Sequence, residues 1–364
     1  MKTNYLILLN ILCTLNISCQ EPVKLPITVP FNSPNISYQG RIAMKDSMAE
    51  IYWSGSQIKI NFKGTGLKAT FKDDKGDNYY NLIIDNDSIG ILRIDTVKKE
   101  YVLASGLADK PHNIKIYKRT EWNRGTTSFY GFVLDAGSTI LNSPVKIRRK
   151  MEFFGNSITA GYGIEDYSGK DRSDSIFTNN YMTYATLTAR HFNAECNYTV
   201  RSGIGIMVSW FPIIMPELFD RLDPNDANSK WNFENYTPNI VVINLFQNDS
   251  WLLKMPKSPE YLYRFKNQKA PDENKIIESY SIFVENIREK YKNAHIICML
   301  GNMDITKKGS PWPGYVQKAV DSMNDPLIYT LFVPFKNTKG HPNIEEHKAM
   351  AESLIKFIDR NIKW

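Results

Sequence analysis

The sequence predicts two domains: an all-β sandwich over residues 25–145, followed by an α/β domain over residues 150–364 with a five-stranded parallel sheet. The chain has 364 residues, which is more than one hydrophobic core usually holds. Apolar and polar residues alternate in short segments up to about residue 141, whereas continuous apolar segments alternate with helical patterns after residue 150. Half-buried antiparallel strands followed by fully buried parallel strands would produce this change of period.

Three segments of the first part alternate most clearly, and they are separated by Gly, Asp and Pro turn signals: residues 57–63, 67–71 and 113–117. Several short strands with this spacing favour an antiparallel sandwich. The acidic segment Asp73–Asp77 lacks the distal glutamate of a calcium-binding loop, so we interpret it as a hairpin turn.

The second part contains five apolar segments typical of strands buried on both faces: residues 151–154, 195–200, 240–245, 295–300 and 327–333. Helical patterns lie at residues 181–192, 275–291, 316–323 and 343–362. Strands alternating with helices favour a parallel sheet covered on both faces, and such sheets bind ligands at the carboxyl ends of their strands.

The composition excludes several classes of protein. Hydrophobic residues make up 42% of the chain and charged residues 23%, which excludes an intrinsically disordered chain. The net charge of +7 is spread along the sequence, whereas nucleic-acid-binding proteins usually carry a concentrated basic patch. We interpret the densest basic segment, Lys146–Lys150, as a solvated strand edge or linker, and we expect no nucleic-acid partner.

The first residues resemble an export signal. Lys2 precedes the apolar residues 5–15, which are too few to span a bilayer as a mature helix. A small residue, Ser18, directly precedes Cys19, as in a bacterial lipobox. Residues 1–18 are therefore predicted to be a lipoprotein signal peptide with Cys19 as the lipidation site, and plain signal-peptide cleavage nearby is the alternative. We expect an exported protein of a Gram-negative bacterium, periplasmic or on the cell surface, with the lipid anchor as its only membrane attachment.

Two further cysteines, Cys196 and Cys298, lie inside predicted strands. The sequence contains no C-x-x-C spacing, so we expect two buried thiols rather than a disulfide, and no metal site.

The chemistry-bearing residues gather after predicted strands of the second domain. Residues 153–163 lead an apolar strand into a turn that carries Ser157, which places a hydroxyl at the carboxyl edge of the sheet. Thr159 stands where the nucleophile-elbow motif G-x-S-x-G requires its second glycine. On the residues alone, a serine that caps a helix is an equally good interpretation.

Two neighbouring strand ends offer hydrogen-bond donors. Residues 200–205 present glycine backbone N–H groups, and residues 243–249 place Asn248 directly after a buried strand. A side-chain amide and a glycine N–H are the donors that an oxyanion hole needs. The alternative for Asn248 is an asparagine that caps the loop.

One of the five histidines, His341, follows the last predicted strand and so lies at the same sheet edge as Ser157 and Asn248. A serine and a histidine that meet there make a nucleophile and a general base. His347 lies further into the last helix and is predicted to be a surface residue.

These motifs resemble those of the SGNH (GDSL-type) hydrolases and, within that superfamily, of carbohydrate esterase family 2. The four catalytic-domain motifs occur in the family's order, at residues 155–163, 201–205, 248–249 and 341–342. Segments of the first domain are similar to the family's N-terminal jelly roll, at residues 78–81, 117–121 and 129–132. The resemblance implies a jelly roll followed by an SGNH domain that removes acetyl groups from plant polysaccharides or their oligosaccharides, without metal or cofactor.

The resemblance also implies roles for single residues. Ser157 matches the nucleophile and His341 the general base. The oxyanion hole would consist of the backbone N–H groups of Ser157 and Gly203 and the side chain of Asn248. We expect a monomer whose partner is the acetylated saccharide.

Two tryptophans, Trp251 and Trp312, are candidates to stack on a sugar ring, with packing under a loop as the alternative.

The sequence departs from the family pattern at three places. Asn156 and Phe246 replace the usual Asp and Gly, and we expect them to change the floor of the pocket. Thr338 stands where the triad acid is usual, three residues before His341. We therefore expect a Ser157–His341 dyad whose imidazole is held by a backbone carbonyl or by a side-chain oxygen of Thr338 or Asn337.

The alternative to the dyad is a carboxylate from elsewhere in the chain, and Asp249 and Glu165 are the first candidates. The departures also keep two other functions open: an SGNH esterase or lipase that acts on other esters, and a lipid-anchored glycan-binding protein with a silent hydrolase domain.

Overall fold

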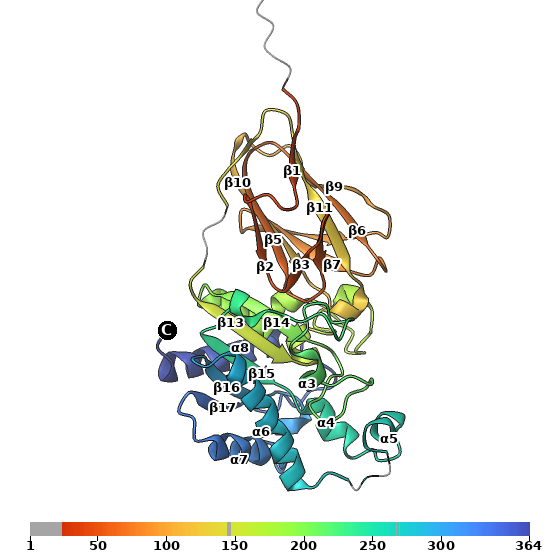
Figure 1. Cartoon of the computed structure of the whole chain (residues 1–364), viewed down its shortest axis with the longest axis vertical. Helices are drawn as coiled ribbons and strands as arrows, with labels where there is room; N and C mark the ends of the chain where they lie inside the picture. The colour runs from red at the N-terminus through yellow and green to blue at the C-terminus, as the bar shows by residue number, and fades with distance from the viewer. Residues whose placement is uncertain (1–23, 144–146, 267, 269) are drawn as a thin grey trace, which may run out of the picture.

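The computed structural model describes residues 24–143, 147–266, 268 and 270–364. The predicted signal peptide and Cys19 lie outside these residues. Figure 1 shows the first domain stacked end to end on the second, with the first strand β1 near the far end of the sandwich.

The first domain consists of two antiparallel sheets packed face to face. One sheet contains β1 (Ile27–Pro30), β3 (Ile42–Met44), β4 (Ala49–Ile51), β6 (Leu67–Asp73), β9 (Lys99–Ala104) and β11 (Thr127–Leu134). The other contains β2 (Ile36–Gln39), β5 (Gln57–Gly64), β7 (Tyr79–Ile84), β8 (Ser88–Arg93), β10 (Lys110–Lys118) and β12 (Thr139–Ile140). The alternation predicted for β5, β6 and β10 is confirmed, because every second residue of these strands is buried in the core between the sheets.

The acidic segment Asp73–Asp77 differs from the prediction. It joins β6 of one sheet to β7 of the other, so it is a connection between sheets and not a hairpin turn. The carboxylate of Asp73 accepts hydrogen bonds from the N–H groups of Lys75 and Gly76, at 3.0 and 2.8 Å, and from the hydroxyl of Thr127 at 2.6 Å. These hydrogen bonds within the sandwich compensate for the burial of the Asp73 carboxylate.

The second domain is built on a parallel sheet with the order β14-β13-β15-β16-β17. Its strands are β13 (Lys150–Gly155), β14 (Glu195–Val200), β15 (Ile240–Asn244), β16 (His295–Leu300) and β17 (Ile328–Phe332). All five agree with the predicted segments to within one residue. Alternate residues of the strands enter two cores, one on each face of the sheet.

Eight α-helices accompany this sheet in the part of the chain that the structure describes: α1 (Ser157–Ala160), α2 (Tyr184–His191), α3 (Met215–Leu218), α4 (Gln247–Leu252), α5 (Pro259–Phe265), α6 (Glu273–Lys290), α7 (Trp312–Met323) and α8 (Ile344–Asn361). The 3₁₀ turns are η1 (Trp122–Arg124), η2 (Ser175–Phe177), η3 (Asn180–Met182), η4 (Phe233–Asn235) and η5 (Asp304–Thr306). Helices α6 and α7 contribute to one core, and α2 and α8 to the other. None of the described helices is long and apolar enough to cross a membrane.

The two domains share a buried interface. The guanidinium of Arg41, from the sandwich, lies 2.9 Å from the carboxylate of Glu152 on β13, and both side chains are almost completely buried. Arg41 also donates to the carbonyl oxygens of Phe219 and Arg221, at 2.6 and 2.9 Å. A buried ion pair of this kind requires such extra hydrogen bonds to offset its desolvation. The domains are thus joined by a specific polar contact.

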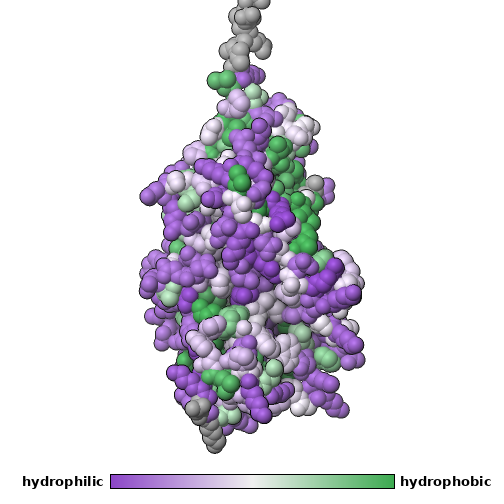
Figure 2. Space-filling view, turned by 90° about the vertical axis from the view of Figure 1, so that its right-hand side faces the viewer, coloured by the Kyte–Doolittle hydropathy of each residue, from purple (hydrophilic) through white to green (hydrophobic). Residues whose placement is uncertain are grey.

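The surface is mainly hydrophilic, but Figure 2 shows a band of hydrophobic residues along one side of the sandwich. The exposed apolar side chains of the sandwich include Ile89 and Ile91 on the edge strand β8 and Val102 on the edge strand β9. Cys196 and Cys298 are buried free thiols, as predicted.

The prediction that His347 lies on the surface is wrong. His347 is 1% exposed, and its Nδ1 accepts a hydrogen bond of 3.1 Å from the backbone N–H of Tyr184. It occupies the same face of α8 as the buried Met350, Ala351 and Leu354, at spacings of three, four and seven residues. This helical spacing, rather than polarity, determines its burial, and burial lowers the pKa of His347 to about 3.

We predict that this histidine makes the protein less stable at acidic pH. The imidazole binds a proton in the unfolded chain below its usual pKa of about 6.5 but stays neutral in the folded chain down to about pH 3. Unfolding therefore takes up one proton in this window, and the free energy of unfolding falls by up to about 1.4 kcal/mol for each pH unit of acidification. Urea unfolding at about pH 4.5 and pH 7 should show a smaller loss of stability for His347→Asn than for the wild type. His191→Asn, which changes an exposed histidine, serves as the control. Equal losses of stability in all three proteins would contradict the prediction.

Candidate active site

Ser157 lies at the carboxyl edge of the parallel sheet. Strand β13 ends at Gly155, Asn156 is the N-cap of α1, and Ser157 is the first residue of that helix. Asn156 Oδ1 accepts the N–H of Ile158 at 3.0 Å, so Asn156 caps the helix and the Ser157 hydroxyl is free for another role. A side chain at Gly155 would collide with Thr159, which explains the glycine before this turn.

His341 meets Ser157 at this edge. It lies in the connection between β17 and α8, and its Nε2 is 2.8 Å from Ser157 Oγ. The ring of Tyr162 packs against the imidazole with 4.8 Å between the ring centroids. A hydroxyl and an imidazole at this distance can exchange a proton.

The expectation of a dyad is wrong, because Asp171 completes a triad. Asp171 Oδ2 lies 2.7 Å from His341 Nδ1, and Asp171 Oδ1 accepts the backbone N–H of His341 at 3.0 Å. Since an ionised carboxylate only accepts hydrogen bonds, Nδ1 carries the proton and Nε2 is left to accept the hydroxyl proton of Ser157. Partial burial raises the pKa of Asp171, but the hydrogen bonds from His341, with Lys336 nearby, outweigh this effect and lower that pKa below its usual value.

The acids first considered for this role have other partners. The Glu165 carboxylate accepts from Arg119 and, at 2.6 Å, from Asn179 Nδ2. The Asp249 carboxylate accepts the backbone N–H groups of residues 206, 207 and 208 at 2.7–3.0 Å. Burial raises the pKa of Asp249 to about 6, although these three N–H groups act in the opposite direction. Asp249 therefore holds the chain after β14 and does not contact His341.

Asp171 escaped sequence analysis because it belongs to the long connection between α1 and α2, where no strand end marks it. The chain order Ser157, Asp171, His341 was the available signal, since α/β hydrolases also place their acid between the serine and the histidine. Thr338, at the usual acid position, instead bonds to Glu346 and Lys336.

Gly203 and Asn248 follow the strands on either side of β13. Gly203 has φ = +82°, a left-handed conformation that suits glycine. Among the described residues, neither the Gly203 N–H nor the Ser157 N–H has a hydrogen-bond acceptor. Both donors are thus available to a ligand.

The amide of Asn248 is fixed by two hydrogen bonds. Its Nδ2 donates to the carbonyl oxygen of Ile204 at 2.8 Å, and its Oδ1 accepts the indole N–H of Trp210 at 3.1 Å. These partners determine which end of the amide is the nitrogen and leave one Nδ2 hydrogen free. Trp210 was not found by sequence analysis, although it lies only seven residues after Gly203.

The two tryptophans proposed to stack on sugar lie in different environments. Trp312 is 4% exposed, with its ring 5.0 Å from Phe246 and 5.7 Å from Tyr315, so the expectation that it binds sugar is wrong. It begins the amphipathic helix α7 and packs into the core. Trp251 is partly exposed, and its indole N–H donates to Asp304 at 2.9 Å. Trp210 is 41% exposed and contacts the Gly203 turn.

The expectation for Phe246 also requires correction. Its ring is fully buried between Tyr280 and Trp312, so it belongs to the core and not to the floor of a pocket. Phe246 has φ = +76°, which explains why glycine is the usual residue at this position.

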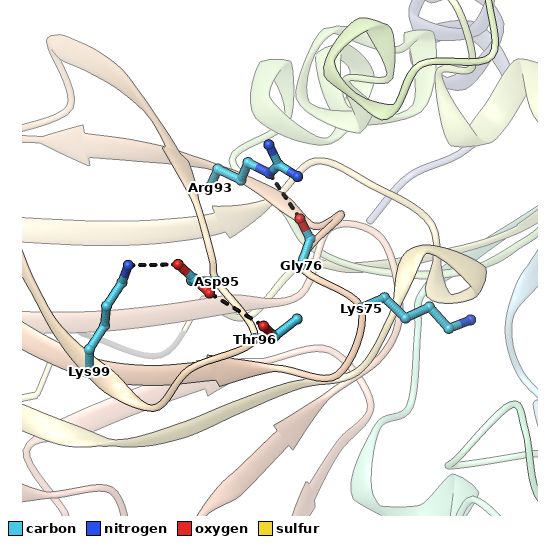
Figure 3. Close-up of a pocket in the computed structure, with 6 residues that line it drawn as sticks. All are labelled: Lys75, Gly76, Arg93, Asp95, Thr96 and Lys99. Atoms are coloured by element: carbon cyan, nitrogen blue, oxygen red, sulfur yellow. Dashed lines mark hydrogen bonds and ion pairs between the residues drawn. The ribbon is translucent and has the colours of Figure 1, made fainter.

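A cavity of about 350 Å³ in the sandwich is lined by Lys75, Gly76, Arg93, Asp95, Thr96 and Lys99. Figure 3 shows Arg93 Nε donating to the carbonyl oxygen of Gly76, at 2.9 Å, and Lys99 paired with Asp95 at 2.8 Å. No residue of the candidate active site lines this cavity. Within the described residues, no group of three His, Cys, Asp or Glu side chains could hold a metal ion.

The comparisons with known proteins agree with the fold described above. A family model described as the N-terminal domain of carbohydrate esterase 2 matches residues 38–144. The cellulase/esterase CelE of Acetivibrio thermocellus is 32% identical over 347 residues, which cover 92% of this chain and 40% of that protein. An acetylxylan esterase/glucomannan deacetylase of Cellvibrio japonicus is 22% identical over 346 residues, covering 93% of this chain and 92% of that protein.

The structure is also similar to that of a family two carbohydrate esterase from Clostridium thermocellum in complex with cellohexaose. That chain is 31% identical with a TM-score of 0.78, and the match covers 89% of this chain and 98% of that chain. The predicted combination of a jelly-roll-like sandwich and an SGNH domain is therefore confirmed.

We predict that Asp171→Asn lowers turnover of an ester substrate by about 10⁴-fold, because the amide no longer fixes the tautomer or stabilises the imidazolium. Asp174→Asn is the matched control, since it changes an exposed carboxylate of the same connection. Steady-state kinetics of both variants provide the test. Turnover of Asp171→Asn within tenfold of the wild type would show that the histidine works without this acid.

Loss of the Asn248 amide should lower kcat more than loss of the Trp210 indole N–H, which orients that amide. We expect Asn248→Ala to lower kcat by about 10²–10³-fold. Trp210→Phe removes only one hydrogen bond, worth about 1 kcal/mol, and should lower kcat about fivefold. Trp251→Phe, which also removes an indole N–H, is the control. If Asn248→Ala raised only KM, Asn248 would bind substrate without stabilising the oxyanion.

Proposed function

The chain belongs to carbohydrate esterase family 2, and we propose that it removes O-acetyl groups from plant polysaccharides or their oligosaccharides through an acyl-enzyme on Ser157. The observation that carries this proposal is the continuous hydrogen-bonded series from Asp171 through His341 to Ser157, with spacings of 2.7 and 2.8 Å. The chain spans 40% of the length of CelE.

The proposed first step forms the acyl-enzyme. His341 Nε2 takes the proton of Ser157 Oγ as the oxygen attacks the acetyl carbonyl carbon. Asp171 stabilises the resulting imidazolium through Nδ1. The N–H groups of Ser157 and Gly203 and the free Nδ2 hydrogen of Asn248 supply donors for the oxyanion. His341 then returns the proton to the sugar oxygen as the bond between that oxygen and the acetyl carbon breaks.

The second step releases acetate. Water attacks the acetyl-serine while His341 accepts a proton from it, and Ser157 recovers that proton when its bond to the acetyl carbon breaks. The products are acetate and the free sugar hydroxyl, and each group of the triad returns to its starting state.

Aromatic side chains beside the site support a saccharide as the substrate. Trp210 is exposed next to Gly203, and Trp251 is partly exposed one turn beyond Asn248. Exposed indole rings next to a polar site suit the stacking of sugar rings. The related family two esterase that was solved with cellohexaose supports the same class of ligand.

We also propose export and a lipid anchor on Cys19. The apolar segment that follows Lys2 and the Ser18-Cys19 pair support this proposal.

The central test is release of acetate from acetylated xylan and acetylated glucomannan by the wild type and by Ser157→Ala. We expect the wild type to release acetate and the variant to lose activity by several orders of magnitude while keeping its thermal unfolding profile. A variant that keeps more than a tenth of the activity would contradict the role of Ser157. Hydrolysis of acetyl against long-chain nitrophenyl esters distinguishes the proposal from a lipase, for which the long chain would be preferred.

A further inference from the structure

One side chain of the sandwich enters the catalytic domain beside the candidate oxyanion hole. Glu121 lies between β10 and the 3₁₀ turn η1, and its side chain is 2% exposed. One carboxylate oxygen accepts the hydroxyl of Ser202 at 2.6 Å, and the other accepts the backbone N–H of Ser202. Glu121 thus binds the residue directly before Gly203 at two points.

The negative charge of Glu121 is balanced locally. The guanidinium of Arg201 lies 3.6 Å from the Glu121 carboxylate and packs over the rings of Trp122 and Phe211, at 5.3 and 4.7 Å. A buried carboxylate without a counter-ion would oppose the negative charge that develops on a nearby carbonyl oxygen. Arg201 therefore allows an acid to hold this turn without disfavouring an oxyanion.

The segment that carries Glu121 is itself fixed. Lys118 Nζ donates to the carbonyl oxygens of Thr120 and Glu121, at 3.0 and 3.3 Å. Arg119 donates to the carbonyl oxygens of Ile176 and Thr178 in the catalytic domain, at 3.0 and 3.3 Å. The segment that carries Glu121 is consequently held by groups from both domains.

The turn after β14 is held at both ends. Glu121 holds Ser202 at its start, and Asp249 binds the N–H groups of residues 206–208 at its end. Gly203, with its free N–H, lies between these two anchors. Rotation about the backbone at Ser202 would change the direction of that N–H, and the two bonds from Ser202 to Glu121 oppose such rotation.

We propose that Glu121 is a positioning residue that orients the Gly203 N–H toward the developing oxyanion, so that the sandwich forms part of the esterase mechanism. This inference rests on the proposed function, because it takes the Gly203 N–H to be an oxyanion donor. Glu121 acts through Ser202 and does not touch the substrate.

Glu121→Gln tests the proposal, because the amide can still accept one hydrogen bond but loses the charge and the second acceptor oxygen. We expect kcat per active site, counted by labelling with a serine-reactive phosphonate, to fall about tenfold to a hundredfold with KM nearly unchanged. Ser202→Ala removes only the hydroxyl bond and should lower kcat less. The loss of kcat in the double variant should not exceed the product of the two single-variant losses, since both changes act on one contact. Glu50→Gln is the matched control, because the Glu50 carboxylate contacts Tyr52 and Lys45 of its own domain.

Backbone hydrogen exchange of residues 201–208 provides a readout independent of activity. We expect faster exchange at Ser202, whose N–H donates to Glu121, in Glu121→Gln and no change in Glu50→Gln. A kcat of Glu121→Gln within twofold of the wild type would overturn the positioning role. Absence of acetate release by the wild type would instead contradict the proposed function. In that case unchanged exchange in Glu121→Gln overturns the inferred hold on Ser202, and faster exchange supports it.

Discussion

The hydrogen bond between Asp171 and His341 is the interaction on which the rest of the site depends. An imidazole can take a proton from Ser157 only if its other nitrogen already carries one, and Asp171 imposes this tautomer. Asp171 holds both the ring and the backbone N–H of His341, at 2.7 and 3.0 Å, so it fixes the position of the residue as well as its protonation. The connection between α1 and α2, which carries Asp171, is thereby bound to the connection between β17 and α8, which carries His341.

Much of this arrangement follows from the sequence. Period-two alternation identified three of the sandwich strands, β5, β6 and β10, and continuous apolar runs identified the five parallel strands, because burial on one or two faces leaves different patterns. A parallel sheet brings the ends of its strands to one edge, so Ser157, Asn248 and His341 could be placed near one another before the structure was known.

The remaining features depend on contacts that no local pattern encodes. Asp171 lies in an irregular connection, where an aspartate is common and its partner is set by the path of the chain. Trp312 and Phe246 follow strand ends as site residues do, yet they pack against each other in the core. His347 lies on the buried face of α8, which its spacing from Met350 and Leu354 determines and its polarity does not reveal.

The ion pair between Arg41 and Glu152 bears on how such chains can be rearranged in evolution. Removal of one partner from a buried pair costs about 3–5 kcal/mol, because the other charge stays buried without compensation. A catalytic domain cut free from its sandwich would retain Glu152 on β13 with no guanidinium opposite. The sandwich is therefore not an exchangeable module like many appended binding domains, and gene fusion or domain shuffling should transfer the two domains as one unit.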